Sequence, residues 1–194
     1  MSSDSALSRA IASKARCPVG ASSTFFTVLT EGIHLWSGPW YSGAVSSNAT
    51  HSGALLSIGY EGRSLGDVVD LLVEHNVDVL VDVRLNAISR KRGLSKTALS
   101  QALAIAGIEY LHERALGNPK DNRDDFRQGR RAARDRYLRS LSNGGRSAFF
   151  DTVELARTRR VALFCYEKSH LECHRSCIAE RAMQEVPSMQ VVEL

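Results

Sequence analysis

The sequence predicts an α/β domain: a mainly parallel sheet of about five strands, covered by helices on both faces in a three-layer, Rossmann-like arrangement. Two observations carry this prediction. Short apolar runs alternate with stretches in which apolar residues recur at helical spacing, which is typical of parallel strands joined by helical crossovers. The apolar centre of residues 77–84 is continuous, as burial on both faces of a sheet requires.

The elements follow one another in a regular order. Ser64 caps the first predicted helix, with Asp67 at the acidic position of a capping box. Gly107 is expected to end the second helix in a left-handed conformation, whereas Gly129 is expected to leave the long polar third helix, residues 121–141, unbroken. Ser147 is the predicted cap of the fourth. The strands are predicted at residues 55–60, 77–84, 108–112, from 161 onward and at 189–194, and the helices start near residues 65, 95, 121, 147 and 175.

We predict a single domain over residues 54–194, preceded by a poorly ordered, flexible extension over residues 1–53. A chain of 194 residues is long enough for one domain of usual size and too short for two. The extension is rich in Ser, Ala, Gly and Thr and has neither helical nor strand periodicity. A translation start assigned too far upstream would give the same pattern, so whether the extension belongs to the native protein stays open.

Composition and charge indicate a globular protein and exclude a membrane-spanning one. Hydrophobic residues make up 43% of the chain and charged residues 24%, as in ordinary globular domains. No apolar run approaches the roughly 18 residues that a membrane span needs, so we predict no membrane partner. The net charge of +4 fits a small anionic molecule, nucleic acid or no charged partner at all, and does not decide between them. The oligomeric state stays open.

The cysteines and the N-terminal sequence predict a cytoplasmic protein. Three of the four cysteines lie close together late in the chain, which is not the pattern of a secreted disulfide framework. The first residues lack the apolar core of a secretory signal. Residues 1–16 are basic and rich in Ser, which leaves an organellar presequence as the less favoured alternative.

Polar side chains follow several of the predicted strands. The carboxyl ends of parallel strands lie at one edge of a sheet, where open α/β folds bind their ligands. We therefore predict an enzyme that acts on a small anionic or nucleotide-like substrate at this edge. The candidate catalytic residues are Cys165, Glu167 and His174. The candidate substrate-binding residues are Tyr60, Asp82, Arg84, His112 and Arg175.

Six short motifs, taken in order, resemble the domain-of-unknown-function 488 family. They are residues 57–65 (SIGYEGRSL), 81–84 (VDVR), 107–110 (GIEY), 116–117 (LG), 165–167 (CYE) and 173–175 (CHR). The resemblance covers about residues 55–194. It implies a cytosolic bacterial α/β domain with the Cys-x-Glu and Cys-His-Arg elements at its pocket, and it implies no particular reaction.

Each candidate also has a purely structural explanation. Cys165 is either a small apolar core residue or a nucleophile, and the nucleophile would need a lowered thiol pKa, which His174, Arg175 and the start of the following helix would favour. Glu167 would raise that pKa, so we assign it to proton transfer or to pairing with Arg84 or Arg175. Asp82 is expected to pair with its neighbouring Arg, either to orient it towards an anion or only to brace the sheet edge.

His112, Tyr60 and the clustered cysteines also allow both a functional and a structural explanation. His112 and Tyr60 are either proton-transfer groups or ordinary packing residues. The strand-end Cys ahead of an Arg is somewhat similar to rhodanese and cysteine-dependent phosphatase domains, but Arg175 lies too far from Cys165 for their tight anion loop. The set Cys165, Cys173, His174 and Cys177 has the ligand types of a zinc site but not the usual paired spacing. We therefore predict no metal site and no cofactor.

Clustered arginines suggest an alternative function, a nucleic-acid-binding module in which the Cys, His and Arg cluster is structural. Seven arginines lie between residues 123 and 139, and bidentate phosphate contacts suit arginine better than lysine. On one continuous helix, several of them would form a stripe that binds phosphates. The residues assigned to this alternative are Arg90, Lys91, Arg92, Arg127, Arg130 and Arg134.

Overall fold

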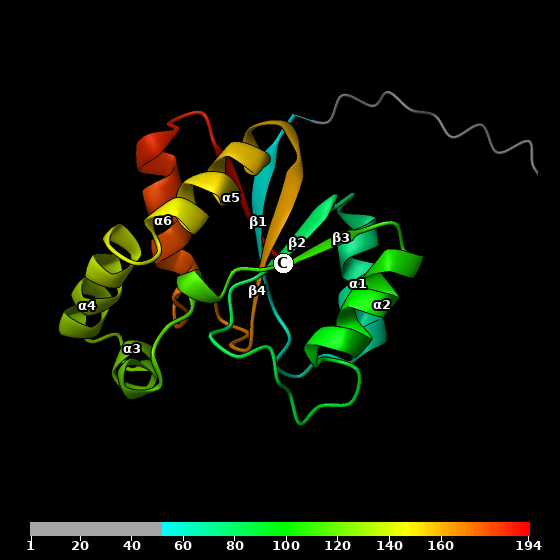
Figure 1. Cartoon of the computed structure of the whole chain (residues 1–194), viewed down its shortest axis with the longest axis horizontal. Helices are drawn as coiled ribbons and strands as arrows, with labels where there is room; N and C mark the ends of the chain where they lie inside the picture. Colours follow the sequence, from blue (N-terminus) through cyan, green and yellow to red (C-terminus); the bar gives the residue numbers. More distant parts are fainter. Residues whose placement is uncertain (1–51) are drawn as a thin grey trace, which may run out of the picture. The chain divides into compact units, whose positions relative to one another are not determined.

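Five strands form one all-parallel sheet in the computed structural model, which describes residues 52–194 (Figure 1). In spatial order the sheet runs β3-β2-β4-β1-β5. The strands are β1 (Ala54–Gly59), β2 (Val79–Asp82), β3 (Glu109–His112), β4 (Arg160–Cys165) and β5 (Gln190–Glu193). The predicted fold class is confirmed. The predicted extension lies, up to residue 51, outside the described residues.

Six α-helices connect these strands in the described part of the chain. They are α1 (Leu65–Glu74), α2 (Lys96–Ile105), α3 (Arg123–Arg127), α4 (Arg131–Ser142), α5 (Arg146–Thr158) and α6 (Arg175–Glu185). Two short 3₁₀ turns, Arg114–Leu116 and Lys120–Asn122, precede α3. Ser64 caps α1 as predicted, because its backbone N–H donates to Asp67 Oδ2 at 2.7 Å and its hydroxyl accepts from the Asp67 N–H at 3.2 Å. Gly107 follows α2 with φ +75°.

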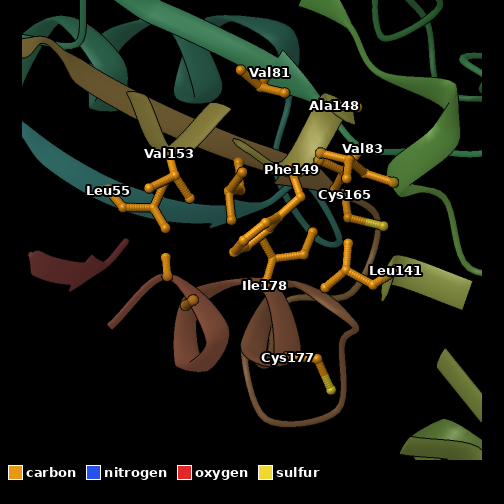
Figure 2. Packing of buried hydrophobic residues seen from close by; sticks show 14 of the residues in the cluster. Leu55, Val81, Val83, Leu141, Ala148, Phe149, Val153, Cys165, Cys177 and Ile178 are labelled. Atoms are coloured by element: carbon orange, nitrogen blue, oxygen red, sulfur yellow. The ribbon is translucent and has the colours of Figure 1, made fainter. Parts of the chain in front are cut away.

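The sheet divides the core into two layers. Alternate residues of a strand point to opposite faces, so Leu55 and Leu163 pack with α4, α5 and α6, whereas Leu56 and Ala162 pack with α1 and α2. Figure 2 shows the first layer, with Val153 and Phe149 of α5 and Ile178 of α6 close to the strands. Both faces are covered, which explains the continuous apolar runs in the sequence.

The prediction of one helix over residues 121–141 is wrong. Gly129 has φ +69°, a left-handed conformation that ends α3, and α4 starts separately at Arg131. The predicted cap of α5 is also wrong, since Gly145 is the N-cap and Ser147 lies inside the first turn. The helix break matters for function, because Arg127 and Arg134 do not lie on one continuous helix face.

The connections place a cleft at the carboxyl ends of the central strands. From β1 the chain passes through α1 to β2 on one face of the sheet, and from β4 it passes through α6 to β5 on the other. β1 and β4 are neighbours, so the loops that follow them leave in opposite directions, and open α/β sheets bind ligands at such a point. Within residues 52–194, no helix combines the length and apolar character of a membrane span.

Candidate functional site

A cavity of about 570 Å³ lies beyond the carboxyl ends of β1, β2 and β4. Its walls come from the loops after these three strands and from α3. Of the predicted site residues, those that line it are Tyr60, Arg84, Arg90, Lys91, Arg127, Cys165, Glu167 and His174. The structure therefore brings half of the predicted nucleic-acid residues and all three predicted catalytic residues to one cavity.

Two thiols meet one carboxylate oxygen in the wall of this cavity. The Cys165 Sγ and the Cys173 Sγ each lie 3.2 Å from Glu167 Oε2. His174 Nδ1 is 3.6 Å from the Cys173 Sγ. One ligand-type atom from each of the four residues lies within 4.8 Å of all the others. We call Cys165, Glu167, Cys173 and His174 the Cys-Glu-Cys-His cluster.

The end of β4 places the first half of this cluster by crossing over β1. The chain after Cys165 passes so close to Gly59 that a Cβ atom there would lie 1.9 Å from the Glu167 carbonyl oxygen. Two backbone hydrogen bonds hold this crossing, from the Tyr60 N–H to the Cys165 carbonyl at 3.1 Å and from the Glu61 N–H to the Tyr166 carbonyl at 2.9 Å. A glycine at position 59 is therefore required for the position of Glu167.

The start of α6 places the second half. His174 is the N-cap of α6, and its Nε2 lies 3.1 Å from the Val83 carbonyl oxygen after β2. A carbonyl only accepts hydrogen bonds, so Nε2 carries the proton. In the neutral ring the lone pair is then on Nδ1, which faces Cys173. The neutral imidazole thus directs an acceptor atom into the cluster and the protonated imidazole directs a donor; burial lowers the pKa of His174, but Cys173 and other neighbours together raise it by more.

Arg175 supports the cluster from inside the protein. Its side chain is fully buried, its Nε donates to the Cys173 Sγ at 3.3 Å, and one of its terminal nitrogens donates to the Glu167 carbonyl. Arg175 does not line the cavity. The geometry therefore favours a bracing role for Arg175 over the predicted contact with substrate.

The two thiols of the cluster differ in acidity. A hydrogen bond with Cys173, together with burial, raises the pKa of Cys165 well above that of an ordinary thiol. Burial also acts to raise the pKa of Cys173, but the Cys165 hydrogen bond and the charge of His174 outweigh it and lower the pKa well below the usual value. The surroundings therefore favour loss of a proton from Cys173 over loss from Cys165. The nucleophilic role predicted for Cys165 loses its electrostatic support.

Arg127 joins α3 to the cluster. Its terminal nitrogen donates to Glu167 Oε1 at 2.9 Å, so both carboxylate oxygens of Glu167 have partners. Burial lowers the pKa of Arg127, but its hydrogen bond with Glu167 and the charges of Glu167 and Asp124 together raise it by more. The predicted pairing of Glu167 with Arg84 or Arg175 is therefore wrong, since Arg84 pairs with Asp82 and Arg175 donates only to the Glu167 backbone carbonyl. The sequence predicts a role for Arg127 only in nucleic-acid binding, because it lies 40 residues from Glu167 and no local pattern signals their contact.

Asp82 and Arg84 form a buried ion pair beside the cavity. Two parallel hydrogen bonds of 2.8 and 2.6 Å join them, and the Tyr110 hydroxyl donates to Asp82 at 2.7 Å. Another Arg84 nitrogen donates to the Leu94 carbonyl at 2.8 Å and to the Tyr60 hydroxyl at 3.4 Å. With these donors engaged inside the protein, the geometry favours the structural explanation for the pair, even though Arg84 lines the cavity.

The other predicted residues lie outside the cavity. The Nε2 atom of His112 lies 2.9 Å from the Arg84 carbonyl, a contact that holds the loop after β2. Arg130 pairs with Asp125 at 2.8 Å, and Arg134 makes two contacts of 2.8 Å to the Glu180 carboxylate. Arg92 is exposed. The residues that do not line the cavity are Asp82, His112, Arg175, Arg92, Arg130 and Arg134.

Sequence reasoning missed part of the site. It weighed Cys173 only for zinc, although a Cys two residues before a helix start is well placed for a lowered pKa. Asn118, Arg123 and Phe126 also line the cavity; Asn118 comes from the connection between β3 and α3, and the other two come from α3 itself. No periodic pattern in the sequence indicates that this part of the chain packs beside the ends of β1 and β4. Cys177 belongs elsewhere: in Figure 2 it lies on α6, well apart from Cys165, with its sulfur pointing away.

Comparison with known proteins supports the family that the motifs suggested. Searches among curated proteins and among solved structures gave no match. The profile of the family described as "Domain of unknown function DUF488" matches residues 64–182, more than half of the 194-residue chain. The match spans α1 to α6 and includes every residue of the Cys-Glu-Cys-His cluster. The chain belongs to the DUF488 family.

Proposed function

We propose that this protein is an enzyme that acts on a small anionic substrate of nucleotide size in the strand-end cavity. The observation that carries the proposal is that one cavity combines a basic wall with the Cys-Glu-Cys-His cluster. Open α/β folds bind their ligands at this location in the sheet.

The charge of the cavity supports an anionic substrate. Five basic side chains line it, against two acidic ones, Glu167 and Glu172. Arg84 is neutralised by Asp82, and Arg127 is shared with Glu167. The remaining basic side chains, Arg90, Lys91 and Arg123, come from the loop after β2 and from α3, so they would contact a phosphate from two sides.

The size and walls of the cavity fit a molecule larger than inorganic phosphate. About 570 Å³ lies within the usual range of about 300–1,000 Å³ for small-molecule sites. Tyr60 and Tyr166 line the cavity, and their rings meet edge to face with centroids 5.4 Å apart. They offer an apolar surface for a base or another flat group, while the basic side chains bind its phosphate.

The Cys-Glu-Cys-His cluster supports an enzyme rather than a simple binding protein. Anion binding needs cations and backbone N–H groups, whereas two thiols and a carboxylate would repel an anion once ionised. A concentration of nucleophilic and proton-transferring groups in one concave site is typical of catalysis. Glu167 and His174 keep their predicted roles in proton transfer in this proposal, and Cys165 belongs to the site without the electrostatic support that a nucleophile needs.

The basic wall can be tested with two arginines of one loop. Both arginines are exposed, but only Arg90 lines the cavity. We expect Arg90→Ala to weaken the binding of AMP about tenfold, since a lost contact to a charged group is worth about 1.5–3 kcal/mol before solvent screening. Isothermal titration calorimetry of the wild type and the variant with AMP measures the effect.

The matched control is Arg92→Ala, which removes the same charge two residues away. We expect it to leave the affinity for AMP within about twofold, and we expect adenosine, which has no phosphate, to bind both proteins more weakly than AMP. Equal losses in Arg90→Ala and Arg92→Ala would contradict a specific role for the cavity. Failure of AMP, pyrophosphate and inorganic phosphate to bind the wild type would remove the anionic substrate.

Nucleic-acid binding stays a prediction. The arginines assigned to it are placed less favourably than they would be on one continuous helix. The break at Gly129 separates Arg127 from Arg130 and Arg134, and acidic partners pair with the latter two. Arg90, Lys91 and Arg127 instead line the cavity. Short DNA or RNA that binds with a salt dependence lowered equally by Arg90→Ala and Arg92→Ala would favour this alternative.

A further inference from the structure

We propose that the Cys-Glu-Cys-His cluster binds one zinc ion, with Cys165 Sγ, Cys173 Sγ, His174 Nδ1 and a Glu167 carboxylate oxygen as its ligands. This inference goes beyond the proposed function, because metal binding is measured without any substrate. It also replaces the ligand set considered from the sequence: Glu167 takes the place of Cys177, which lies elsewhere on α6.

The spacing of the four atoms fits tetrahedral zinc. With Zn–S near 2.3 Å and Zn–N or Zn–O near 2.0 Å, neighbouring ligand atoms of a tetrahedron lie about 3.3–3.8 Å apart. The distances in the cluster are 3.2 Å for each Sγ to Glu167 Oε2 and 3.6 Å for Cys173 Sγ to His174 Nδ1. All four atoms lie within 4.8 Å of one another, so small side-chain rotations complete the site.

The chemistry of the ligands selects the ion. Two thiolates disfavour magnesium and calcium, which prefer oxygen, and the sulfurs, the imidazole and the carboxylate are each ligand types that zinc takes in proteins. A bound cation also explains why two thiols and a carboxylate lie so close together. A carboxylate oxygen that faces two sulfurs at 3.2 Å is repelled as soon as both thiols lose their protons, and a divalent cation among them turns this repulsion into attraction.

The surroundings of the cluster are those of a metal site. His174 donates through Nε2 to the Val83 carbonyl, which leaves Nδ1 as the ligand, and metal-bound histidines almost always make such a bond with the second ring nitrogen. The Glu167 oxygen that is not a ligand accepts from Arg127 at 2.9 Å. The Cys173 sulfur accepts from Arg175 at 3.3 Å. Three ligands are thus oriented by groups outside the cluster.

The location of the cluster gives the ion access to a bound molecule. All four ligand residues line the cavity, and each is at most 9% exposed, so the ion would be shielded from bulk water but in contact with the cavity. The basic wall would hold an anion near it. With four protein ligands the ion has no open position, so a water or an oxygen of the bound molecule would reach it only as a fifth ligand, where zinc would polarise that oxygen.

Zinc content of the full chain tests the proposal. The protein is expressed with added zinc, passed over a gel-filtration column, and analysed by inductively coupled plasma mass spectrometry. We expect one zinc per chain in the wild type. We expect Cys165→Ser and Cys173→Ser to lose more affinity than the roughly 10–100-fold expected for Arg127→Ala, which removes only a group that orients a ligand.

Cys177→Ser is the matched control, because Cys177 is also a buried free cysteine but lies outside the cluster. It should keep one zinc per chain. Metal-free wild type titrated with cobalt(II) should show thiolate-to-cobalt absorption, unchanged in Cys177→Ser. Circular dichroism of each variant shows whether it folds, and if a cysteine variant does not, Glu167→Gln and the wild-type cobalt spectrum decide the question.

Three results would overturn the proposal: a folded wild type that takes up neither zinc nor cobalt, a cobalt spectrum without thiolate absorption, or folded Cys165→Ser and Cys173→Ser variants with the wild-type zinc content. If zinc binds and AMP does not, the metal site stands and the anionic substrate fails. If AMP binds to a protein that takes up no zinc, the reverse holds.

Discussion

Asp82→Ala is expected to lower the free energy of unfolding by about 3–5 kcal/mol, the largest single-residue effect on stability that we expect. The Asp82 carboxylate is fully buried, and its loss leaves the Arg84 guanidinium, 6% exposed, without a counterion. Burial by itself lowers the pKa of Arg84, and the hydrogen bonds and charge of Asp82 are what raise it. Urea denaturation followed by circular dichroism measures the loss.

An exposed ion pair provides the comparison. Asp125 pairs with Arg130 at 2.8 Å on the protein surface, so Asp125→Ala should cost at most about 1 kcal/mol. The double variant Asp82→Leu/Arg84→Met removes both buried charges and should recover much of the stability lost in Asp82→Ala. If Asp82→Ala and Asp125→Ala had equal small effects, the Asp82–Arg84 pair would not be the brace described above.

Gly59→Ala is expected to disrupt the Cys-Glu-Cys-His cluster and to cost about 1–3 kcal/mol or more in stability. The new Cβ would meet the Glu167 carbonyl oxygen at 1.9 Å, and because the backbone fixes the positions of both atoms, no side-chain rotation relieves the clash. The segment after Cys165 must move, and it takes Glu167 with it. Zinc affinity and AMP affinity should therefore both fall, alongside the free energy of unfolding.

Gly66→Ala is the matched control for this substitution. Gly66 lies in the first turn of α1, where the nearest atom to an added Cβ is the Ser64 hydroxyl at 3.7 Å. The change should be neutral or stabilise by about 0.4–1 kcal/mol, because alanine restricts the unfolded chain. Gly59→Ala that keeps wild-type stability and zinc affinity would mean that Glu167 does not depend on the crossing over Gly59.

The fold was predictable because its signals are local. Continuous apolar runs identify buried parallel strands, and the capping box at Ser64 marks the start of α1 within the sequence itself. The strand order was not predictable in the same way. β4 lies between β1 and β2, and this insertion depends on contacts between segments about a hundred residues apart.

The candidate site was predictable to the extent that strand ends define it. Parallel strands bring Tyr60, Arg84 and Cys165 to one edge of the sheet regardless of their separation in the chain. The connection between β3 and α4 follows no such rule. A glycine in a polar helix usually costs about 1 kcal/mol without ending it, and the sequence does not show that Gly129 adopts a left-handed conformation instead.

The roles within the cluster could not be assigned from the sequence because they depend on distances of a few tenths of an ångström. Cys165 and Cys173 look equivalent as residue types, yet only Cys173 lies next to both the His174 ring and the Arg175 guanidinium. Arg127 contacts Glu167 from α3, which the sequence predicts as part of one longer helix with α4. Such contacts are set by tertiary packing.

A crystal structure of the protein grown with zinc and AMP tests the central claim, that the strand-end cavity is the functional site, most directly. Anomalous scattering at the zinc edge should locate the ion among Cys165, Glu167, Cys173 and His174, and the phosphate should lie within hydrogen-bond distance of Arg90, Lys91 or Arg123. AMP bound along the outer face of α4, with neither zinc nor nucleotide in the cavity, would contradict it.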